Sequence, residues 1–320
     1  MMERSTIPLN AIQAARGRLA AAVVRTPLVR LNLPGPWGEV FLKLENLQPV
    51  GSFKMRGAGN AILEAGPHRL KDGVWTVSAG NMAQGVAWYA RSLGLPCQVI
   101  VPDDAPLAKL EAIQALGARI VKIPFADYQA VQRTHECALV SGTLIHPFAN
   151  QGVMAGNGTI GLEILEDLPD VETIIIPYGG GGLSCGIASA VRELRPRVKL
   201  YAVEVSTAAP FAASLAAGRP LEVPFTPTFV SGIGGPTIFA EMWELSRALL
   251  HGALVVEPSE IADAIRVLLL RNRVVAEGAG AAALAAVLSG KAPAGRTACI
   301  VSGGNIDASK LVTIMQGGVP

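Results

Sequence analysis

The chain has 320 residues, of which 50% are hydrophobic and 16% are charged, and its mean hydropathy is +0.40. A chain of this length and apolarity buries one large core or two medium-sized cores, and its low charge excludes disorder. Lys and Arg (27) nearly balance Asp and Glu (25), which argues against a nucleic-acid or acidic-membrane partner. Glycine is unusually frequent, with 35 residues, about 11% against an average of about 7%.

The start of the chain, residues 1–24, lacks the continuous apolar run of a secretory signal and predicts an amphipathic first helix. The longest weakly polar run, residues 279–289, is too short to cross a membrane. The four cysteines are scattered without the CxxC spacing of a zinc site, at Cys97, Cys137, Cys185 and Cys299. We therefore expect a reduced, cytoplasmic protein.

Eight short apolar runs alternate with helical stretches rich in Ala and Leu, and each run predicts a strand. In chain order they are residues 40–44, 74–78, 97–101, 119–123, 173–177, 199–203, 254–257 and 297–301. Continuous apolar strands separated by helices are typical of parallel sheets covered on both faces. For about eight strands we expect an α/β fold with two parallel-sheet lobes covered by helices.

The first chemical motif is GSFKMRG, residues 51–57, in which Lys54 lies between Phe53 and Met55 ahead of a helical run. A single lysine is usually a solvated surface residue. Shelter beside Phe53 would instead disfavour its charged form, which is how an amine becomes a nucleophile and a base.

Two glycine patterns match dinucleotide-binding motifs: GNGTIG at residues 156–161 and GAGAAA at residues 278–283. The mechanism also requires a strand directly before the turn and an acidic residue about twenty residues later. No strand precedes the first pattern, and neither has the acidic residue. These glycines are better interpreted as helix caps and positions of close packing.

Four consecutive glycines, residues 179–182, lie between a predicted strand and a predicted helix. Each costs roughly 0.5–1 kcal/mol of stability relative to Ala, so we expect them where side chains are not tolerated. Bare N–H groups at a helix N-terminus bind phosphate, whereas a flexible hinge is the alternative. No Lys-Ser or Lys-Thr follows, which excludes a nucleotide P-loop. Together with Lys54, these glycines suggest a phosphate-bearing aldehyde cofactor.

With these motifs the chain resembles the tryptophan-synthase-β-like (fold type II) pyridoxal-phosphate enzymes, and among them the threonine/serine dehydratase and serine racemase group. The matching segments are RTPL at 25–28, KLENLQ at 43–48, residues 51–57, SAGN at 78–81, IHPF at 145–148, residues 179–183, EG at 277–278 and SGGN at 302–305. They follow the family's order over nearly the whole chain. The resemblance implies a cofactor cleft between a large domain, residues 1–70 and 149–320, and a small domain, residues 71–148.

The resemblance also implies residue roles. Lys54 corresponds to the Schiff-base lysine and catalytic base, and the phosphate cup corresponds to Gly179, Gly180, Gly181 and Gly182. Further cofactor contacts are implied for Asn81 at the phenolic oxygen, Phe53 and Gly232 at the ring faces, and Ser302 at the ring nitrogen. The substrate carboxylate would bind at Ser78, Ala79, Gly80, Asn81 and Met82. Glu277 is equally well explained as a cofactor contact or as a structural carboxylate, and His146 as a packed loop histidine. About half of the 35 glycines, those of residues 156–161 included, fall in segments expected around the cofactor.

Two of these residues bear on the type of reaction. The neutral hydroxyl of Ser302 gives the ring nitrogen a hydrogen bond of only about 0.5–1.5 kcal/mol, which disfavours long-lived carbanions and suits β-elimination. Racemases of the group have a hydroxyl where this chain has Ala79, and a methyl group donates no proton. We therefore expect elimination rather than racemisation.

Further departures from the family concern metal and substrate. Glu204 remains from the family's cation site, but its second acid is replaced by Pro210, so no tight metal site is expected. Met82 replaces a usual His, and Ser231 stands where an Asp often precedes the ring-wall glycine, which makes the pocket more apolar. A bulkier substrate such as phenylserine is therefore the alternative to threonine.

The sequence thus predicts a pyridoxal 5'-phosphate-dependent ammonia-lyase that converts an L-threonine- or L-serine-type amino acid into a 2-oxo acid and ammonia. Alternatives are a phenylserine-type dehydratase, a serine racemase, a β-replacement synthase and a non-catalytic cofactor-binding protein. Intact Lys54 and glycine motifs argue against the last. We expect a homodimer, as is common among relatives, and no control by end-product amino acids, because no appended domain follows residue 320.

Overall fold

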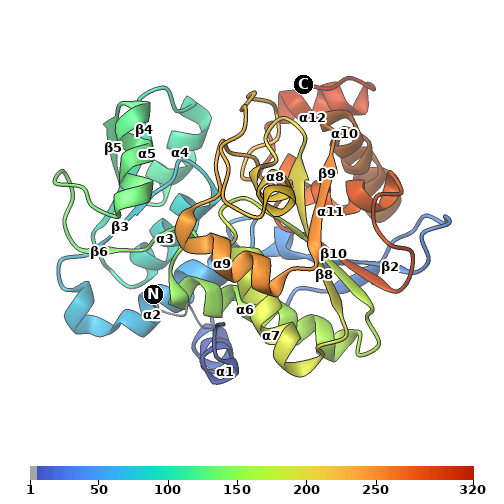
Figure 1. Ribbon diagram of the computed structural model, residues 1–320. Helices are drawn as coiled ribbons and strands as arrows, with labels where there is room; N and C mark the ends of the chain where they lie inside the picture. The colour runs from blue at the N-terminus through green and yellow to red at the C-terminus, as the bar shows by residue number, and fades with distance from the viewer. Residues whose placement is uncertain (1–5) are drawn as a thin grey trace.

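Two β-sheets organise the computed structural model, which describes residues 6–320 (Figure 1). The six-stranded sheet has the order β1-β2-β10-β7-β8-β9, and the four-stranded sheet has the order β5-β4-β3-β6. All neighbouring strands pair in parallel except β1 and β2, which are antiparallel. The predicted α/β class with two parallel-sheet lobes is confirmed, and the antiparallel edge strand is the exception to it.

The strand boundaries agree closely with the apolar runs of the sequence. The strands are β1 Leu28–Arg30, β2 Val40–Leu44, β3 Val74–Val77, β4 Cys97–Pro102, β5 Arg119–Ile123, β6 Thr143–Leu144, β7 Thr173–Pro177, β8 Lys199–Val205, β9 Gly252–Val256 and β10 Thr297–Val301. Of these, β1 and β6 were not predicted, because three and two residues are too few to form an apolar run.

Helices alternate with the strands throughout. They are α1 Leu9–Leu19, α2 Lys54–Leu70, α3 Asn81–Ser92, α4 Leu107–Ala115, α5 Phe125–Thr134, α6 Gln151–Asp167, α7 Gly182–Leu194, α8 Pro210–Ala217, α9 Ala240–Leu249, α10 Pro258–Val267, α11 Gly278–Leu288 and α12 Ala308–Met315, with the short turns η1 Glu45–Leu47 and η2 Leu268–Asn272. Among the described residues, no helix is long and apolar enough to cross a membrane. The predicted first helix begins inside the described part of the chain, and residues 1–5 lie outside it.

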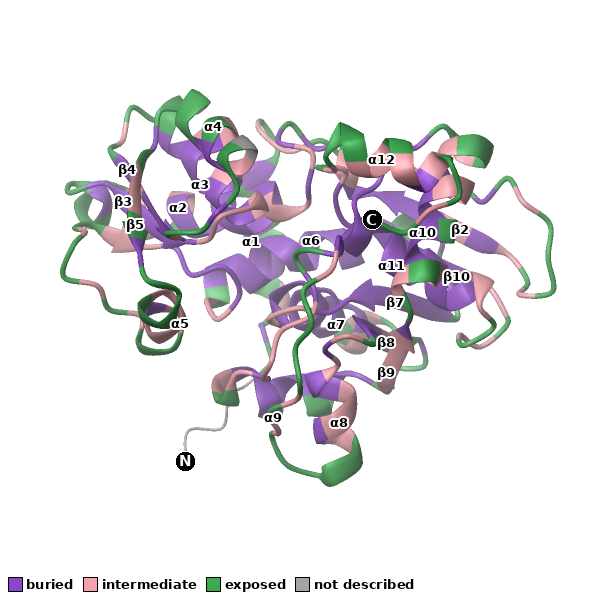
Figure 2. Cartoon of the chain, turned by 90° about the horizontal axis from the view of Figure 1, so that it is seen from above, coloured by how far each residue is buried: buried purple, intermediate pink, exposed green. Residues whose placement is uncertain are grey.

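The central strand β7 shows why the large sheet needs continuous apolar runs. Ile174 and Ile176 pack into a core with α1, α6, α7 and α9 on one face, whereas Ile175 packs into a second core with α10, α11 and α12. Successive side chains of a strand point to opposite faces, so a sheet covered on both faces is apolar at every position. In Figure 2 these central strands and the helices packed on them are mostly purple.

The four-stranded sheet is also covered on both faces, and with α3, α4 and α5 it forms what we call the small lobe. Val74 and Val99 pack with α2 and α3, and Trp75 and Ile100 face α5. Figure 1 shows this lobe beside the six-stranded sheet and its helices, which we call the large lobe. The domain boundaries at residues 70/71 and 148/149 stay a prediction.

The glycines of residues 156–161 lie in the middle of α6, so they form no strand–turn–helix motif. A Cβ added at Gly156 would lie 2.2 Å from the backbone oxygen of Arg56, and one at Gly158 would lie 2.9 Å from that of Gly186. These glycines therefore let α6 pack closely against α2 and α7, as the packing interpretation predicted. The expectation that they surround the cofactor is wrong.

Candidate active site

A cavity of about 600 Å³ lies where the turns after β3, β7 and β10 meet the start of α2 and the segment after β6. Ligands of open α/β sheets gather at the carboxyl ends of the strands, and these turns follow such ends. Residues of both lobes line this cavity. Among the residues predicted for the site it is lined by Lys54, Ser78, Ala79, Gly80, Asn81, Met82, Gly179, Gly180, Gly232 and Glu277.

Lys54 is the first residue of α2, and its side chain reaches the cavity. Its Nζ donates a hydrogen bond of 2.7 Å to the carbonyl oxygen of Pro147 and lies 5.1 Å from the centre of the Phe53 ring. Burial lowers the pKa of Lys54 to about 8, although the nearby carboxylate of Glu277 raises it. A larger fraction of this amine than of an ordinary lysine is therefore neutral and nucleophilic near neutral pH.

The turn between β7 and α7 presents an unusual run of unpaired backbone N–H groups. Within residues 6–320, none of the N–H groups of residues 179–184 donates a hydrogen bond to another protein group. Gly179 and Gly180 line the cavity, and α7 begins at Gly182. Unpaired N–H groups at the N-terminus of a helix bind anions, and phosphate in particular.

Glycine is required in this turn because a side chain would collide with neighbouring protein atoms. A Cβ at Gly180 would lie 2.2 Å from the ring of Phe148, and one at Gly182 would lie 2.7 Å from its Cα. A Cβ at Gly179 would lie 2.6 Å from the backbone oxygen of Gly232. Gly181 has a φ of +87°, in the left-handed region that favours glycine. Side chains are excluded from this turn, as predicted. The cause, however, is close contact with protein atoms behind the turn.

The turn between β3 and α3 also offers unpaired donors to the cavity. Among the described residues, the backbone N–H groups of Ala79, Asn81 and Met82 donate no hydrogen bond, and α3 begins at Asn81. A carboxylate is favoured at such a helix N-terminus. The Met82 side chain is 1% exposed and packs in the core of the small lobe, where it also borders the cavity.

Asn81 is held in place from two sides. Its Nδ2 donates to Glu277 Oε1 at 2.7 Å, and its Oδ1 accepts from Asn305 Nδ2 at 2.8 Å. An amide nitrogen carries two protons, so one N–H of Asn81 is still free to bind a ligand. Burial raises the pKa of Glu277 to about 7, against the lowering effects of the Asn81 hydrogen bond and the charge of Lys109.

Four predicted residues do not line the cavity: Phe53, Gly181, Gly182 and Ser302. Ser302 directly follows β10 and is 2% exposed, and its carbonyl oxygen accepts a hydrogen bond of 3.0 Å from the Phe53 N–H. Phe53 and Ser302 are thus adjacent and lie behind Lys54. His146 is 2% exposed and accepts the Ala149 N–H at 2.9 Å, so the interpretation as a packed loop histidine is confirmed.

Several cavity residues were not predicted. Lys109, Tyr128 and Gln132 form a polar wall on the small lobe, where Gln132 Nε2 donates to the Tyr128 hydroxyl at 3.2 Å. No sequence motif marks them, since they lie on the ordinary helices α4 and α5. The Pro147 carbonyl that holds Lys54 was not predicted either, because a backbone acceptor leaves no compositional signal.

Glu204 at β8 is a buried carboxylate outside the cavity. Its two carboxylate oxygens accept the N–H groups of Phe211 and Ala212, at 2.9 and 2.7 Å, and thereby cap α8. Burial raises the pKa of Glu204 to about 7, although these two hydrogen bonds lower it. The prediction that no tight metal site exists here stays a prediction.

The Glu204→Gln variant is expected to change how stability depends on pH. A carboxyl whose pKa is higher in the folded than in the unfolded state contributes stability below pH 4.5, and loses it as the pH rises to about 7. Gln does not ionise. The free energy of unfolding of the wild type, measured with urea, should therefore fall by about 1–3 kcal/mol more than that of the variant between pH 4.5 and 8. Parallel pH curves would contradict this assignment.

Comparisons with known proteins agree with this geometry. A family model described as "Pyridoxal-phosphate dependent enzyme" matches residues 19–303. The chain is 40% identical to an L-threonine ammonia-lyase of Thermotoga maritima over 98% of its own length and 79% of the relative's. Among solved structures it is similar to a threonine deaminase of T.th., with a TM-score of 0.85, 35% identity and coverage of 93% and 98% of the two chains. A serine racemase of Dictyostelium discoideum has a TM-score of 0.84, 33% identity and coverage of 95% and 100%.

Proposed function

Because the chain belongs to the pyridoxal-phosphate-dependent enzymes of fold type II, in the threonine dehydratase and serine racemase group, we propose that it converts L-threonine or L-serine into a 2-oxo acid and ammonia by β-elimination followed by hydrolysis. The family and the pyridoxal 5'-phosphate cofactor predicted from the motifs are confirmed. One observation carries the proposal: a lysine with a lowered pKa shares a cavity with a run of unpaired N–H groups at a helix start. The Thermotoga maritima relative supports threonine as the substrate.

The residues present fit this cofactor. Its phosphate needs donors, which the N–H groups of residues 179–184 supply, and its aldehyde needs an amine, which Lys54 supplies. The free N–H of Asn81 is available to the ring oxygen, and Gly232 lines the cavity beside the space for the ring. Phe53 and Ser302 lie outside the cavity lining, so their contacts with the ring stay a prediction. Glu277 then acts through Asn81, whose amide it orients at 2.7 Å.

When bound, pyridoxal phosphate supplies an aldehyde that condenses with amines and a conjugated ring that accepts electrons from the substrate's Cα. The Lys54 amine removes the proton from Cα, because its lowered pKa leaves it partly neutral. The N–H groups of Ala79, Asn81 and Met82 bind the substrate carboxylate. The β-hydroxyl leaves as water with the proton that Lys54 took from Cα, which returns the amine to its neutral form. One water then hydrolyses the released product to one 2-oxo acid and one ammonia.

Elimination is expected to exceed racemisation. Ala79 lines the cavity where a racemase needs a second proton donor, and its methyl group supplies none. With L-serine, formation of pyruvate should therefore be faster than formation of D-serine. Chiral chromatography and a 2-oxo acid assay on the same reaction measure both rates, and faster D-serine formation would refute the assignment.

The substrate is tested with threonine, serine and phenylserine. We expect the highest kcat/KM for threonine, with 2-oxo acid and ammonia formed in equal amounts. A preference for phenylserine would favour the alternative of a bulky substrate, and formation of a thioether when a thiol is added would indicate a β-replacement synthase. Absence of 2-oxo acid from all three substrates would overturn the proposed function.

Three further predictions accompany the function. We propose the domain division 1–70 with 149–320 and 71–148, which the separation of the two sheets supports. The homodimer is tested by sedimentation of the purified protein, where a single species near the monomer mass would contradict it. The cytoplasmic location is tested by cell fractionation.

A further inference from the structure

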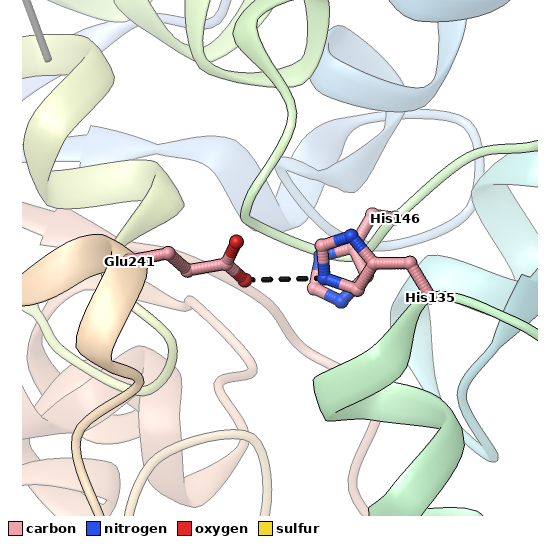
Figure 3. Close-up of side chains that lie close together, drawn as sticks. All are labelled: His135, His146 and Glu241. Atoms are coloured by element: carbon pink, nitrogen blue, oxygen red, sulfur yellow. Dashed lines mark hydrogen bonds and ion pairs between the residues drawn. The ribbon is translucent and has the colours of Figure 1, made fainter. Parts of the chain in front are cut away.

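Three side chains meet where the small lobe contacts the large lobe: His135, His146 and Glu241 (Figure 3). His135 directly follows α5 in the small lobe, and Glu241 lies in the first turn of α9 in the large lobe. The Nε2 atom of His135 is 3.1 Å from Oε1 of Glu241, and the rings of His135 and His146 are in contact, tilted by 39° with centres 4.2 Å apart. The three groups lie within 4.8 Å of one another, which is the spacing of a metal site.

The hydrogen bonds of His146 exclude a metal ion. Its Nδ1 accepts the Ala149 N–H at 2.9 Å, and its Nε2 lies 3.2 Å from the carbonyl oxygen of Gln132. These partners assign an unprotonated Nδ1 and a protonated Nε2, so neither nitrogen has a free lone pair. Burial, followed by the charges of His135 and Lys54, lowers the pKa of His146 to about 3, which keeps the ring neutral.

The turn that follows His146 contacts both parts of the cofactor site. Phe148 lies against the ring of His146, with centres 4.5 Å apart at 81°, and its ring fills the space in which Gly180 has no side chain. Between them, the carbonyl oxygen of Pro147 accepts the 2.7 Å hydrogen bond from Lys54. A shift of His146 therefore moves the neighbours of both the lysine and the glycine turn.

The turn of residues 146–149 also contacts the large lobe. Phe239, directly before α9, contacts the ring of Phe148, with centres 4.4 Å apart. The same helix carries Glu241, which binds His135. The contacts thus close a circuit from α9 through His135, His146 and Phe148 back to α9. His135 connects this circuit to α5 of the small lobe, which it directly follows.

We propose that His135 is a positioning residue: it binds Glu241, clamps the ring of His146 and holds the turn of residues 146–149 against Lys54 and the glycine turn. His135 itself does not line the cavity. The proposal rests on the cofactor site and is independent of which amino acid is the substrate.

The contact between His135 and Glu241 is partly shielded from water, with 31% and 21% of the two side chains exposed. It fixes the His135 ring against His146, so loss of either partner releases the clamp.

Three variants test the clamp. His135→Asn removes the ring, and Asn tolerates the left-handed backbone at this position, where φ is +63°. Glu241→Gln removes the partner's charge. Glu244→Gln is the matched control, because Glu244 lies on the same helix but is exposed and pairs with Arg247.

The measurement is the dissociation constant of pyridoxal phosphate from the holoenzyme, by equilibrium dialysis without substrate. We expect His135→Asn and Glu241→Gln each to weaken cofactor binding about fivefold, and the double variant to lose no more than either single one. Glu244→Gln should lie within about twofold of the wild type.

Additive losses in the double variant would mean that His135 and Glu241 act independently and would overturn the proposal, as would no loss in the single variants. Tight Zn²⁺ binding by the wild type that His135→Asn abolishes would also overturn it, because a metal site requires a lone pair on His146. Since no substrate is present, failure to deaminate threonine leaves this test unaffected.

Discussion

The Lys54→Ala variant is expected to lose at least about a thousandfold in kcat for L-threonine and to lose the cofactor's visible absorbance band. Lys54 supplies both the amine that binds the cofactor's aldehyde and the base that removes the proton from Cα. Its pKa of about 8 results from burial at the start of α2 and makes it suited to both roles. Stopped-flow and steady-state kinetics with 2-oxobutanoate detection measure the loss.

The control for this variant is Lys71→Ala, since Lys71 is an exposed lysine at the end of the same helix. It should retain both turnover and absorbance. Lys109 is a second lysine in the cavity wall. If Lys54→Ala retained the band and more than about a tenth of the turnover, Lys109 or another amine would carry the chemistry and our assignment of Lys54 would be wrong.

The Arg56→Met variant is expected to lower the free energy of unfolding by about 3–5 kcal/mol. Arg56 is 1% exposed and binds two buried carboxylates, Glu45 through Nε at 2.8 Å and Glu163 through Nη1 at 2.7 Å. Lys43 binds Glu163 as well, so two cations balance two anions. Removing Arg56 leaves a buried net negative charge, which is far costlier than losing an exposed ion pair.

The lowered pKa of Glu45 supports this expectation. Burial alone raises the pKa of Glu45, but Arg56 and the hydroxyl of Thr26 hold it below its ordinary value. Urea denaturation of the holoenzyme gives the free energies, and Arg69→Met, at an exposed position of α2, should change them by less than about 0.5 kcal/mol. If Arg56→Met yields no folded protein, Thr26→Val, which removes a 2.6 Å bond to Glu45, should still cost about 1–2 kcal/mol. A loss below about 1 kcal/mol in Arg56→Met would contradict the account.

Most of the fold was predictable because both sheets are buried on both faces. The run TIIIP, which forms β7, has one interpretation in such an architecture, and its boundaries agree with the predicted ones. Antiparallel β1 was not predictable, since three residues at a sheet edge carry no periodic signal. The glycines of α6 show the opposite case. They match a dinucleotide-binding pattern, but glycine is needed there because α6 packs closely against its neighbouring helices.

Site residues were predictable where the chemistry requires a particular side chain. They were not predictable where a backbone group or a long-range contact is sufficient. Lys54, Asn81 and Glu277 line one cavity as the motifs implied. The Pro147 carbonyl and the contact between His135 and Glu241 depend on long-range packing, and no local pattern marks them. The glycine turn lies between these cases, because its N–H groups were expected and its packing against Phe148 was not.

The central claim is that Lys54, in the cavity with the unpaired N–H groups of residues 179–184, carries the cofactor. The most direct test reduces the holoenzyme with borohydride, which fixes the cofactor to the lysine that holds it, and maps the modified peptide by mass spectrometry. We predict one phosphopyridoxyl group per chain on the peptide containing Lys54. Modification of Lys109 instead, or of no lysine in a protein that still converts threonine, would contradict the account.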